Sequence, residues 1–532
     1  MKWNKLVVGL LLIMFLGVVV ACSDDKDEDA VGKEAKANVN KSGFPIVDDE
    51  ITLDLFTAKS DVNVSMDWNE LPAWKEYEDM TNIKTNWVEQ VTMDSLEEKR
   101  NLALGSGQLP DVFYSANFPN SDLFKYGQQG VILPLNDLID EYAPNLKKIM
   151  EEDPNIEKGM TFSDGNIYSL PAVWSNDFLS IRVGARPWVD ETWLERLDME
   201  EPETTEEFYD FLSAVKEADE DVIPYSGVNM DDLVSWMEGS FGLETTGADL
   251  VGEDPEGDGY RFNPISDDYR EMLEYIHQLY DEKLIEQNIF SIEWNQYMAN
   301  AAEGKYASTM FYDPLLTFSG KGEDFTSISA LEGPHGDQKY LGVAPTLSNN
   351  GQFVITEKNP NPAATVRWLD YFYSDEGAKL LYMGIEGESF VEEDGQFKYT
   401  DEIENADHRE KAISEYVPWV GVNPPGLVTE DYFSGSEASE ASIEAAQKIE
   451  PYIPEEIMSD VIYTKDENKY MTSTGKDIQK YVEEMRDQFI SGDEPLDDAN
   501  WKRYIDTIED MGLEKYMDIQ NDALERYKSG GE

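Results

Sequence analysis

The chain has 532 residues and a formal net charge of −68, from 110 acidic and 42 basic residues. This excess of carboxylates excludes a nucleic-acid partner, because a phosphate backbone needs Lys and Arg to neutralise it, and it disfavours adhesion to an anionic membrane surface. A chain of this length can be stabilised by packing alone, and we expect two lobes. Aromatic residues form 12% of the sequence, which excludes a disordered protein.

The N-terminus has the pattern of an export signal. Lys2 and Lys5 precede an apolar run over residues 6–20, which is shorter than the ~20 apolar residues of a membrane-spanning helix. The run ends at Ala21-Cys22 and resembles a bacterial lipoprotein signal, which implies lipid on the Cys22 sulfur and a lipid anchor on the extracellular face of the membrane. The alternative is an ordinary secretory signal with a chance cysteine. Because Cys22 is the only cysteine, an intramolecular disulfide is excluded.

After the signal of residues 1–21, residues 22–44 are rich in Asp, Lys and Ala and lack periodicity, which predicts a flexible tether. The pattern then predicts, in chain order, a strand at 51–56, a helix at 94–105, a strand at 111–114, a turn and strand at 164–171, helices at 202–216, 268–284, 294–304 and 360–381, and a helical C-terminus from 476. Strands that alternate with helices favour an α/β fold with largely parallel sheets.

Several motifs, spread over nearly the whole mature chain, resemble one family. They are LPAWKEY at 71–77 followed by TNI at 81–83, GSGQLPDV at 105–112, DGNIYSLP at 164–171, the stretch from NPAATVRWLDYF to GIEGESF at 361–390, and the last helix around 519–527. The chain resembles the extracellular solute-binding proteins of carbohydrate ABC importers, in particular the large lipoprotein branch of Gram-positive bacteria. The stretch at 361–390 is the most specific of these motifs.

The resemblance implies a type II periplasmic-binding-protein fold, with two discontinuous α/β lobes joined by a hinge. It places residues 45–168 and 345–390 in one lobe, and residues 169–344 and 391–532 in the other. An oligosaccharide would bind in the cleft, and closure of the hinge would signal the loaded state to the permease subunits of the importer. We expect the protein to act as a monomer.

The sequence departs from the family pattern after the first crossing between the lobes. The family often has Arg-x-Asp-Trp-Leu there, whereas this chain has Arg186-Pro-Trp-Val-Asp before residues 191–194. An insertion or a rearrangement at this point leaves the role of Arg186 open. Arg182 and Arg186 would be the partners of an acidic sugar, and the alternative is that each forms a structural ion pair with one of the chain's many carboxylates.

A sugar site needs aromatic rings for the C–H faces of the sugar and planar polar groups for its hydroxyls. Aromatic candidates beside turns are Trp68, Tyr114, Trp174, Trp236, Trp294, Tyr312 and Trp419. Each could equally be a core residue, as we expect for Trp368 and Phe372. Polar candidates that follow strand ends are Asn117, Asn176 and Asp177, and the resemblance places Glu386 in a loop near the cleft. These polar residues could also be turn-formers or surface groups, and for Asp177 we favour that alternative.

The sequence favours a binding protein without catalytic residues, metal or cofactor. The segment 254–259 is similar to the start of a calcium loop, but the twelfth position is Ile265 in place of Glu, and a plain hairpin turn explains it equally. The three histidines lack ligand spacing, and no Gly-x-Ser-x-Gly elbow or phosphate-binding loop is present. Two alternatives stay open, an exported glycosidase with paired carboxylates and a peptide receptor of the same fold.

Overall fold

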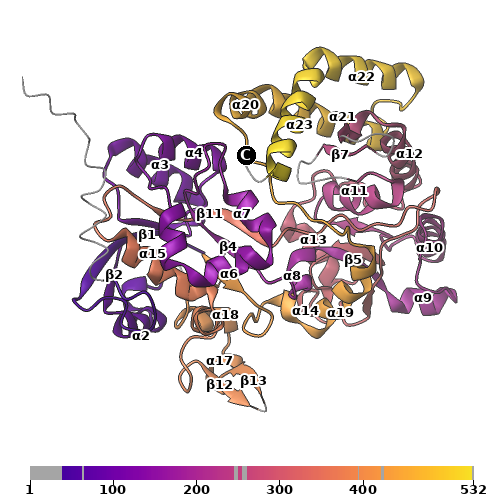
Figure 1. Cartoon of the computed structure of the whole chain (residues 1–532). Helices are drawn as coiled ribbons and strands as arrows, with labels where there is room; N and C mark the ends of the chain where they lie inside the picture. The colour runs from indigo at the N-terminus through magenta and orange to yellow at the C-terminus, as the bar shows by residue number, and fades with distance from the viewer. Residues whose placement is uncertain are drawn as a thin grey trace, which may run out of the picture.

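The computed structural model describes residues 39–60, 62, 65–244, 250–254, 260–393, 395–420 and 424–529. The signal, Cys22, most of the tether and most of the calcium-like segment lie outside these residues. Two sheets, each covered by helices, form two lobes that lie side by side in Figure 1. Among the described residues, no helix is long and apolar enough to cross a bilayer.

The first lobe is built on a six-stranded sheet in the order β14-β4-β11-β3-β1-β2. Its strands are β1 (Ile51–Lys59), β2 (Ile83–Thr92), β3 (Val112–Tyr114), β4 (Leu170–Trp174), β11 (Leu347–Ile355) and β14 (Gly426–Val428). All pairs are parallel except those of β11, which runs antiparallel to both of its neighbours. The predicted strands at 51–56 and 111–114, and the turn that leads into a strand near residue 170, are confirmed.

Helices cover both faces of this sheet (Figure 1). They are α2 (Pro72–Thr81), α3 (Leu96–Ser106), α4 (Asn120–Gln128), α5 (Asn136–Tyr142), α6 (Pro144–Glu152), α7 (Pro154–Met160), α15 (Pro362–Asp370) and α16 (Asp375–Tyr382). The helix predicted at 94–105 is confirmed as α3. The single helix predicted at 360–381 is wrong, because the side chain of Ser374 accepts a hydrogen bond from the Gly377 N–H and starts a new helix.

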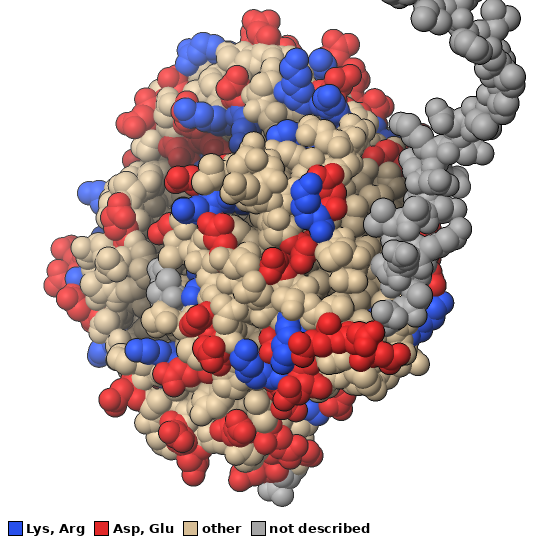
Figure 2. All heavy atoms as spheres, turned by 90° about the vertical axis from the view of Figure 1, so that its left-hand side faces the viewer, with Lys and Arg blue, Asp and Glu red and all other residues tan. Residues whose placement is uncertain are grey.

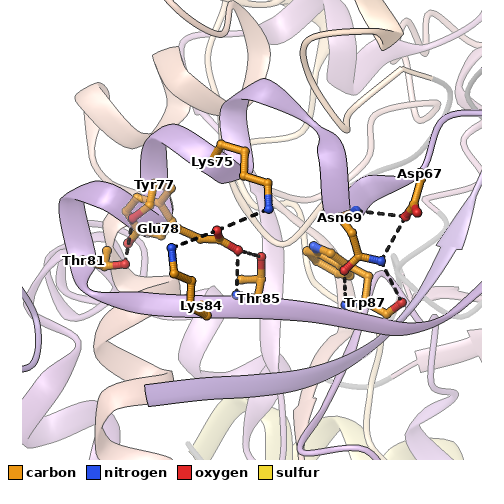
Figure 3. Close-up of polar contacts among 9 residues, drawn as sticks. All are labelled: Asp67, Asn69, Lys75, Tyr77, Glu78, Thr81, Lys84, Thr85 and Trp87. Carbon is orange, nitrogen blue, oxygen red and sulfur yellow. Dashed lines mark hydrogen bonds and ion pairs between the residues drawn. The ribbon is translucent and has the colours of Figure 1, made fainter. Parts of the chain in front are cut away.

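A polar network ties α2 to β2 (Figure 3). The buried carboxylate of Glu78 accepts hydrogen bonds from the backbone N–H and the hydroxyl of Thr85, both at 2.8 Å. Lys84 lies 3.7 Å from the same carboxylate. Further along the strand, Asn69 accepts a bond of 2.9 Å from the N–H of Trp87. Because this buried charge is paired and hydrogen-bonded, its burial costs little, and the network fixes the helix against the sheet edge.

The second lobe is built on a four-stranded sheet in the order β10-β5-β9-β6. Its strands are β5 (Arg186–Asp190), β6 (Ser226–Gly227), β9 (Ser308–Phe311) and β10 (Phe325–Ser327). The helices around it include α8 (Leu179–Val183), α9 (Glu191–Leu197), α10 (Thr205–Ala218), α11 (Met230–Glu238), α12 (Asp267–Asp281), α13 (Trp294–Ala302), α14 (Pro314–Thr317) and α19 (Glu440–Ile449). The helices predicted at 202–216, 268–284 and 294–304 are confirmed, and Thr204 with Glu207 forms the capping box that starts α10.

The C-terminal segment is helical, as predicted, and touches both lobes. It consists of α20 (Lys465–Tyr470), α21 (Lys476–Ser491), α22 (Asp498–Met511) and α23 (Leu513–Ser529). Helix α21 packs on α12 of the second lobe, and α23 contacts α7 of the first. The Ser459 hydroxyl also donates to the Asn155 carbonyl at 3.4 Å. Figure 1 shows α20 next to α4 at the top of the first lobe.

The lobe boundaries differ from those that the resemblance implied. Residues 391–433 belong to the first lobe, because β14 pairs with β4 and because Tyr399, Val417 and Tyr432 pack in the first core. This segment also forms the hairpin β12 (Phe390–Glu393) and β13 (Gln396–Tyr399) with helices α17 (Asp401–Glu404) and α18 (Arg409–Ser414), below the first sheet in Figure 1. The second lobe resumes with α19, whose Ala446 and Ile449 pack in the second core.

The surface reflects the acidic composition. Figure 2, which views the first lobe from outside, shows Asp and Glu side chains spread over this face with fewer Lys and Arg among them. The ion pairs on the surface are mostly between side chains near in sequence, such as Lys147 with Asp140 at 2.8 Å. Exposed pairs of this kind contribute at most about 1 kcal/mol each, so the fold depends on the two cores.

Candidate functional site

The chain crosses between the lobes three times, and the crossing segments are bonded to one another. The backbone N–H of Trp174 donates to the Thr346 carbonyl at 2.8 Å, and that of Ala344 donates to the Arg182 carbonyl at 2.8 Å. On the other side, the N–H of Ser175 donates to the Val428 carbonyl at 2.9 Å. These short, bonded segments form a hinge on which the two lobes can move.

A cavity of 670 Å³ beside these crossings is lined by both lobes. The first lobe contributes Ser115, Asn117 and Gln352, and the second contributes Leu316 and Thr317 of α14. A neighbouring cavity of 390 Å³ shares Asn117 and Asn349 with it and is lined in addition by Trp174. We call these two cavities together the cleft. Its size is that of a small-molecule site.

The first-lobe wall of the cleft carries a cluster of side-chain amides. The Asn117 Oδ1 atom accepts a bond of 2.7 Å from Gln352 Nε2 and one of 3.2 Å from Asn349 Nδ2. Asn117 follows β3 with a φ of 44°, a left-handed conformation that Asn tolerates better than most residues and that aims its side chain across the strand ends.

Two buried polar atoms of this wall lack a hydrogen-bond partner among the described residues. Ser115 Oγ and Gln352 Oε1 are buried and have no hydrogen-bond partner within the part of the chain that the structure describes. A buried polar atom without a partner carries a free-energy cost of about 1–3 kcal/mol, which a ligand hydroxyl that binds it would remove. The cluster can therefore exchange hydrogen bonds with a polyhydroxylated ligand.

The second-lobe side carries exposed apolar groups. Trp294 is 50% exposed and Tyr312 is 46% exposed, and both pack on Phe311 at ring-centroid distances of 5.9 and 5.8 Å. Tyr312 directly precedes α14, in which Leu316 lines the cleft and is 64% exposed. Partial burial raises the pKa of the Tyr312 hydroxyl, so the group is neutral at physiological pH. Neither Trp294 nor Tyr312 is among the residues that line the cleft, although both offer flat apolar faces of the kind that cover the C–H face of a sugar.

The structure places three of the aromatic candidates in the interior. Trp68 and Tyr114 are fully buried in an aromatic cluster of the first core, 6.0 Å apart. Trp236 packs on Phe208 at 5.1 Å in the second core. These rings bury their large apolar area in the cores, so they are out of reach of a ligand and have a packing role.

Arg186 is also in the interior. Its side chain is fully buried, with Nη2 donating to the Ser180 carbonyl at 2.6 Å and Nη1 to the Ser442 carbonyl at 3.4 Å. Burial lowers the pKa of this guanidinium. Arg182 donates to the Ala344 carbonyl at 3.0 Å. Both guanidinium groups therefore bind carbonyl oxygens, and among the described residues neither forms the ion pair with a carboxylate that was one of the two expectations.

Of four further candidates, two aromatic residues line the cleft and two polar residues do not. Trp174 and Trp419 line the cleft, and Trp419 is 8% exposed with its Nε1 bonded to the Tyr382 carbonyl at 2.9 Å. Asn176 is exposed and accepts a bond of 3.1 Å from Arg182. Glu386 is exposed in a turn of the first lobe. Neither Asn176 nor Glu386 lines the cleft.

Sequence reasoning missed Ser115, Asn349 and Gln352. Ser115 follows β3 directly, and the other two lie in β11. A signal for the second pair was present, because the run SNNGQ at 348–352 is polar while the rest of β11 is apolar. A polar run inside a strand that is buried in a sheet marks a place where the strand leaves the core.

The largest cavity described, 890 Å³, lies elsewhere. It is walled by α11 and α21 of the second lobe and by residues 454–458. Its walls come mainly from one lobe, so lobe closure would not bring a second wall onto a ligand there. It touches the cleft only at Pro345 and Asp460, which line both. The described residues contain no group of His, Cys, Asp and Glu side chains arranged to hold a metal ion.

A family model for bacterial extracellular solute-binding proteins matches residues 67–379, which is more than half of the chain. The chain belongs to this family. The matched region contains the amide cluster, Trp294, Tyr312 and two of the three crossings between the lobes. Membership accounts for the two-lobed fold of the type II periplasmic binding proteins, which structural neighbours share.

Two curated proteins show the range of this solute-binding family. The chain is 27% identical to the fructooligosaccharide ABC transporter substrate-binding protein FusA of Streptococcus pneumoniae serotype 4, over 98% of each protein. It is 23% identical to the polygalacturonan/rhamnogalacturonan-binding protein YtcQ of Bacillus subtilis, over 73% of this chain and 74% of that protein. The solved structure of FusA with kestose superposes with a TM-score of 0.71 at 26% identity, covering 90% of this chain and 99% of FusA.

Proposed function

We propose that this solute-binding protein captures an oligosaccharide in the cleft and delivers it to the permease subunits of an ABC importer. The observation that carries the proposal is the pairing of two walls. The first lobe presents hydrogen-bonding amides around Asn117, and the second presents Leu316 and Thr317 of α14, with the exposed ring of Tyr312 close by in sequence. Amides suit the hydroxyl edges of a sugar, and exposed apolar groups suit its C–H faces.

The relatives support a sugar as the solute. FusA is named for fructooligosaccharides and for an ABC transporter, and it is solved with kestose. Its match runs over nearly the whole of both chains, so the cleft, the hinge and the C-terminal helices are all included. When the two lobes close on a neutral or acidic sugar, the loaded protein takes a shape that differs from that of the empty protein. The importer can recognise this difference.

The protein acts, in this proposal, as a monomer held at the outer face of the cell membrane by lipid on Cys22. It carries out no catalysis and needs no cofactor. A FusA structure is described as that of an EF-hand mutant, so a calcium titration is a useful control, although the calcium-like segment of this chain lies largely outside the described residues.

The proposal is tested by thermal unfolding of the chain without residues 1–22, against a panel of oligosaccharides and peptides. A ligand of the folded state raises the melting temperature by mass action. We expect a clear rise with one class of sugar and no change in that sugar on incubation. Conversion of the sugar would favour the glycosidase instead, and a rise with peptides alone would favour the peptide receptor.

A further inference from the structure

A third cavity continues the cleft along the first lobe. This cavity of 450 Å³ lies between the hairpin β12–β13, α17 and residues 431–434, and we call it the outer chamber. Arg409, Phe433 and Ser434 line both the outer chamber and the 670 Å³ cavity of the cleft. The two spaces therefore adjoin at these three residues, so a ligand in the cleft lies next to the outer chamber.

The lining of the outer chamber has the same chemical character as the cleft. Aromatic rings run from one space into the other, with Trp419 and Phe433 5.1 Å apart on the cleft side and Phe397 and Tyr432 5.2 Å apart in the outer chamber. Thr400 and Ser434 supply hydroxyls between the rings. Rings alternating with hydroxyls suit a further sugar unit as well as they suit the first.

The charges along this path oppose an acidic sugar. Two cations line it, and both are paired with carboxylates. Arg409 donates to Glu404 from Nε at 2.9 Å and from Nη2 at 3.0 Å, and Lys398 lies 3.8 Å from Glu393. Further carboxylates without such a pairing line the cleft or the outer chamber, among them Glu410, Glu437 and Asp431.

The other guanidinium groups near the cleft do not change this balance. Arg100 donates to the carbonyl oxygens of Ala116 and Asn117 at 2.7 and 2.6 Å. Arg182 and Arg186 also bind carbonyl oxygens, and Arg186 is fully buried. Within the part of the chain that the structure describes, a carboxylate on the ligand would meet a net negative wall on which every lining cation is already paired, and like charges repel. Hydroxyl groups meet no such penalty.

We propose that the cleft and the outer chamber together bind a neutral oligosaccharide longer than a disaccharide, and that they reject uronic-acid oligosaccharides. This inference rests on the proposed function, since it names the class of sugar that the same site takes. The cleft holds the first units between the two lobes. The outer chamber holds a further unit on the first lobe, beyond the junction at Ser434.

The test uses the chain without residues 1–22 in titration calorimetry at low salt. The neutral ligands are fructo-, xylo- and galacto-oligosaccharides from disaccharide to pentasaccharide, and the acidic ligands are galacturonate and alginate oligosaccharides of the same lengths. We expect one neutral series to bind, more tightly as its length increases from disaccharide to tetrasaccharide, and every acidic series to bind at least about tenfold more weakly. Tighter binding of a uronate series would overturn the inference and leave the proposed function standing, whereas binding of no sugar at all would overturn both.

Two variants test whether the longer ligand occupies the outer chamber. Val391→Trp puts a large ring into the chamber from β12, and Ser434→Phe narrows the junction. Each should remove the gain in affinity of the tetrasaccharide over the disaccharide. Val391→Trp, at a position that lines the outer chamber and not the cleft, should also leave the disaccharide unaffected. Glu392→Trp is the matched control. Glu392 is next to Val391 in β12, but its own side chain is exposed and lines neither space. A length dependence that survives both variants would contradict a role of the outer chamber.

A third variant should increase the affinity for acidic sugars. Glu404→Gln removes the carboxylate that holds the Arg409 guanidinium. The guanidinium then becomes available to a ligand carboxylate, so we expect galacturonate oligosaccharides to bind more tightly to this variant than to the parent chain. Unchanged binding of the acidic sugars, with a normal melting temperature, would count against the charge argument.

Discussion

The aromatic residues of the two lobes have contrasting environments. In the first core, Trp68, Trp74 and Tyr114 contact one another at ring-centroid distances of 5.7–6.1 Å and are almost completely buried. In the second lobe, Trp294 and Tyr312 pack on one side of Phe311 and leave about half of their surface open. The same residue types therefore contribute to stability in one region and offer surface to a ligand in the other.

The largest effect should come from the first core. Trp68→Ala removes a fully buried ring and leaves a cavity among the other aromatic rings, which should lower the free energy of unfolding by about 3–5 kcal/mol. Urea unfolding followed by circular dichroism measures this change. Trp294→Ala is the matched control, and it should lower the free energy of unfolding by clearly less than Trp68→Ala does, because half of its ring is already exposed.

The amide cluster should give the next largest effect, and it should act on binding. Asn117→Ala removes the acceptor of both Asn349 and Gln352, so the cluster loses its arrangement, and we expect oligosaccharide affinity to fall by about 10–100-fold. Calorimetry with the sugar found in the thermal panel measures the loss. Asn86→Ala is the control, because Asn86 is an exposed amide of β2 bonded to Asp54. Equal affinities of the two variants would show that the amide cluster does not contribute to ligand binding.

The exposed rings should have a smaller effect on affinity. Trp294→Ala and Tyr312→Ala each remove one apolar face from the ligand, which we expect to weaken binding by about tenfold with little change in stability. Leu102→Ala, at a 61% exposed apolar position in α3, is the control and should change neither quantity. If the two ring variants lost stability but not binding, Trp294 and Tyr312 would have a packing role like that of the buried rings of the first lobe, and the proposed difference between the lobes would be wrong.

The environment of Trp419 is intermediate between that of the buried rings and that of the exposed rings. Its ring lines the cleft but is 8% exposed, and its Nε1 donates to the Tyr382 carbonyl at 2.9 Å. Trp419→Phe keeps an apolar ring and deletes this hydrogen bond, so it should cost about 1 kcal/mol of stability and change affinity less than Trp294→Ala does. Unfolding and calorimetry on the same sample separate the two effects.

The motifs and the periodicity predicted the fold well, because strands and helices are local patterns of burial. The alternation over 51–56 became β1, and the capping residues Thr204 and Glu207 started α10 where expected. The lobe boundary at 390 was wrong because β14 joins the first sheet through a pairing with β4 that is distant in sequence. Nothing in the three residues of β14 identifies that partner.

The site was harder to predict, because exposure depends on packing between distant segments. Trp68 and Trp294 both stand beside turns in the sequence, and it is the packing of Trp68 against the rings of Trp74, Trp87 and Tyr114 that makes it a core residue. Arg186 illustrates the same limit, since the carbonyl groups that bind it belong to Ser180 and Ser442, the second of which is far away in the chain. Asn117 was predictable because an amide at the end of a strand lies at an edge where ligands commonly bind.

Amide hydrogen exchange with and without the bound oligosaccharide shows whether one ligand is held by both lobes. We expect slower exchange on both walls at once, in residues 115–117 and 349–352 of the first lobe and in residues 316–317 of the second. Protection of one wall alone would contradict the claim. Protection centred on residues 454–458 would move the site to the 890 Å³ cavity instead.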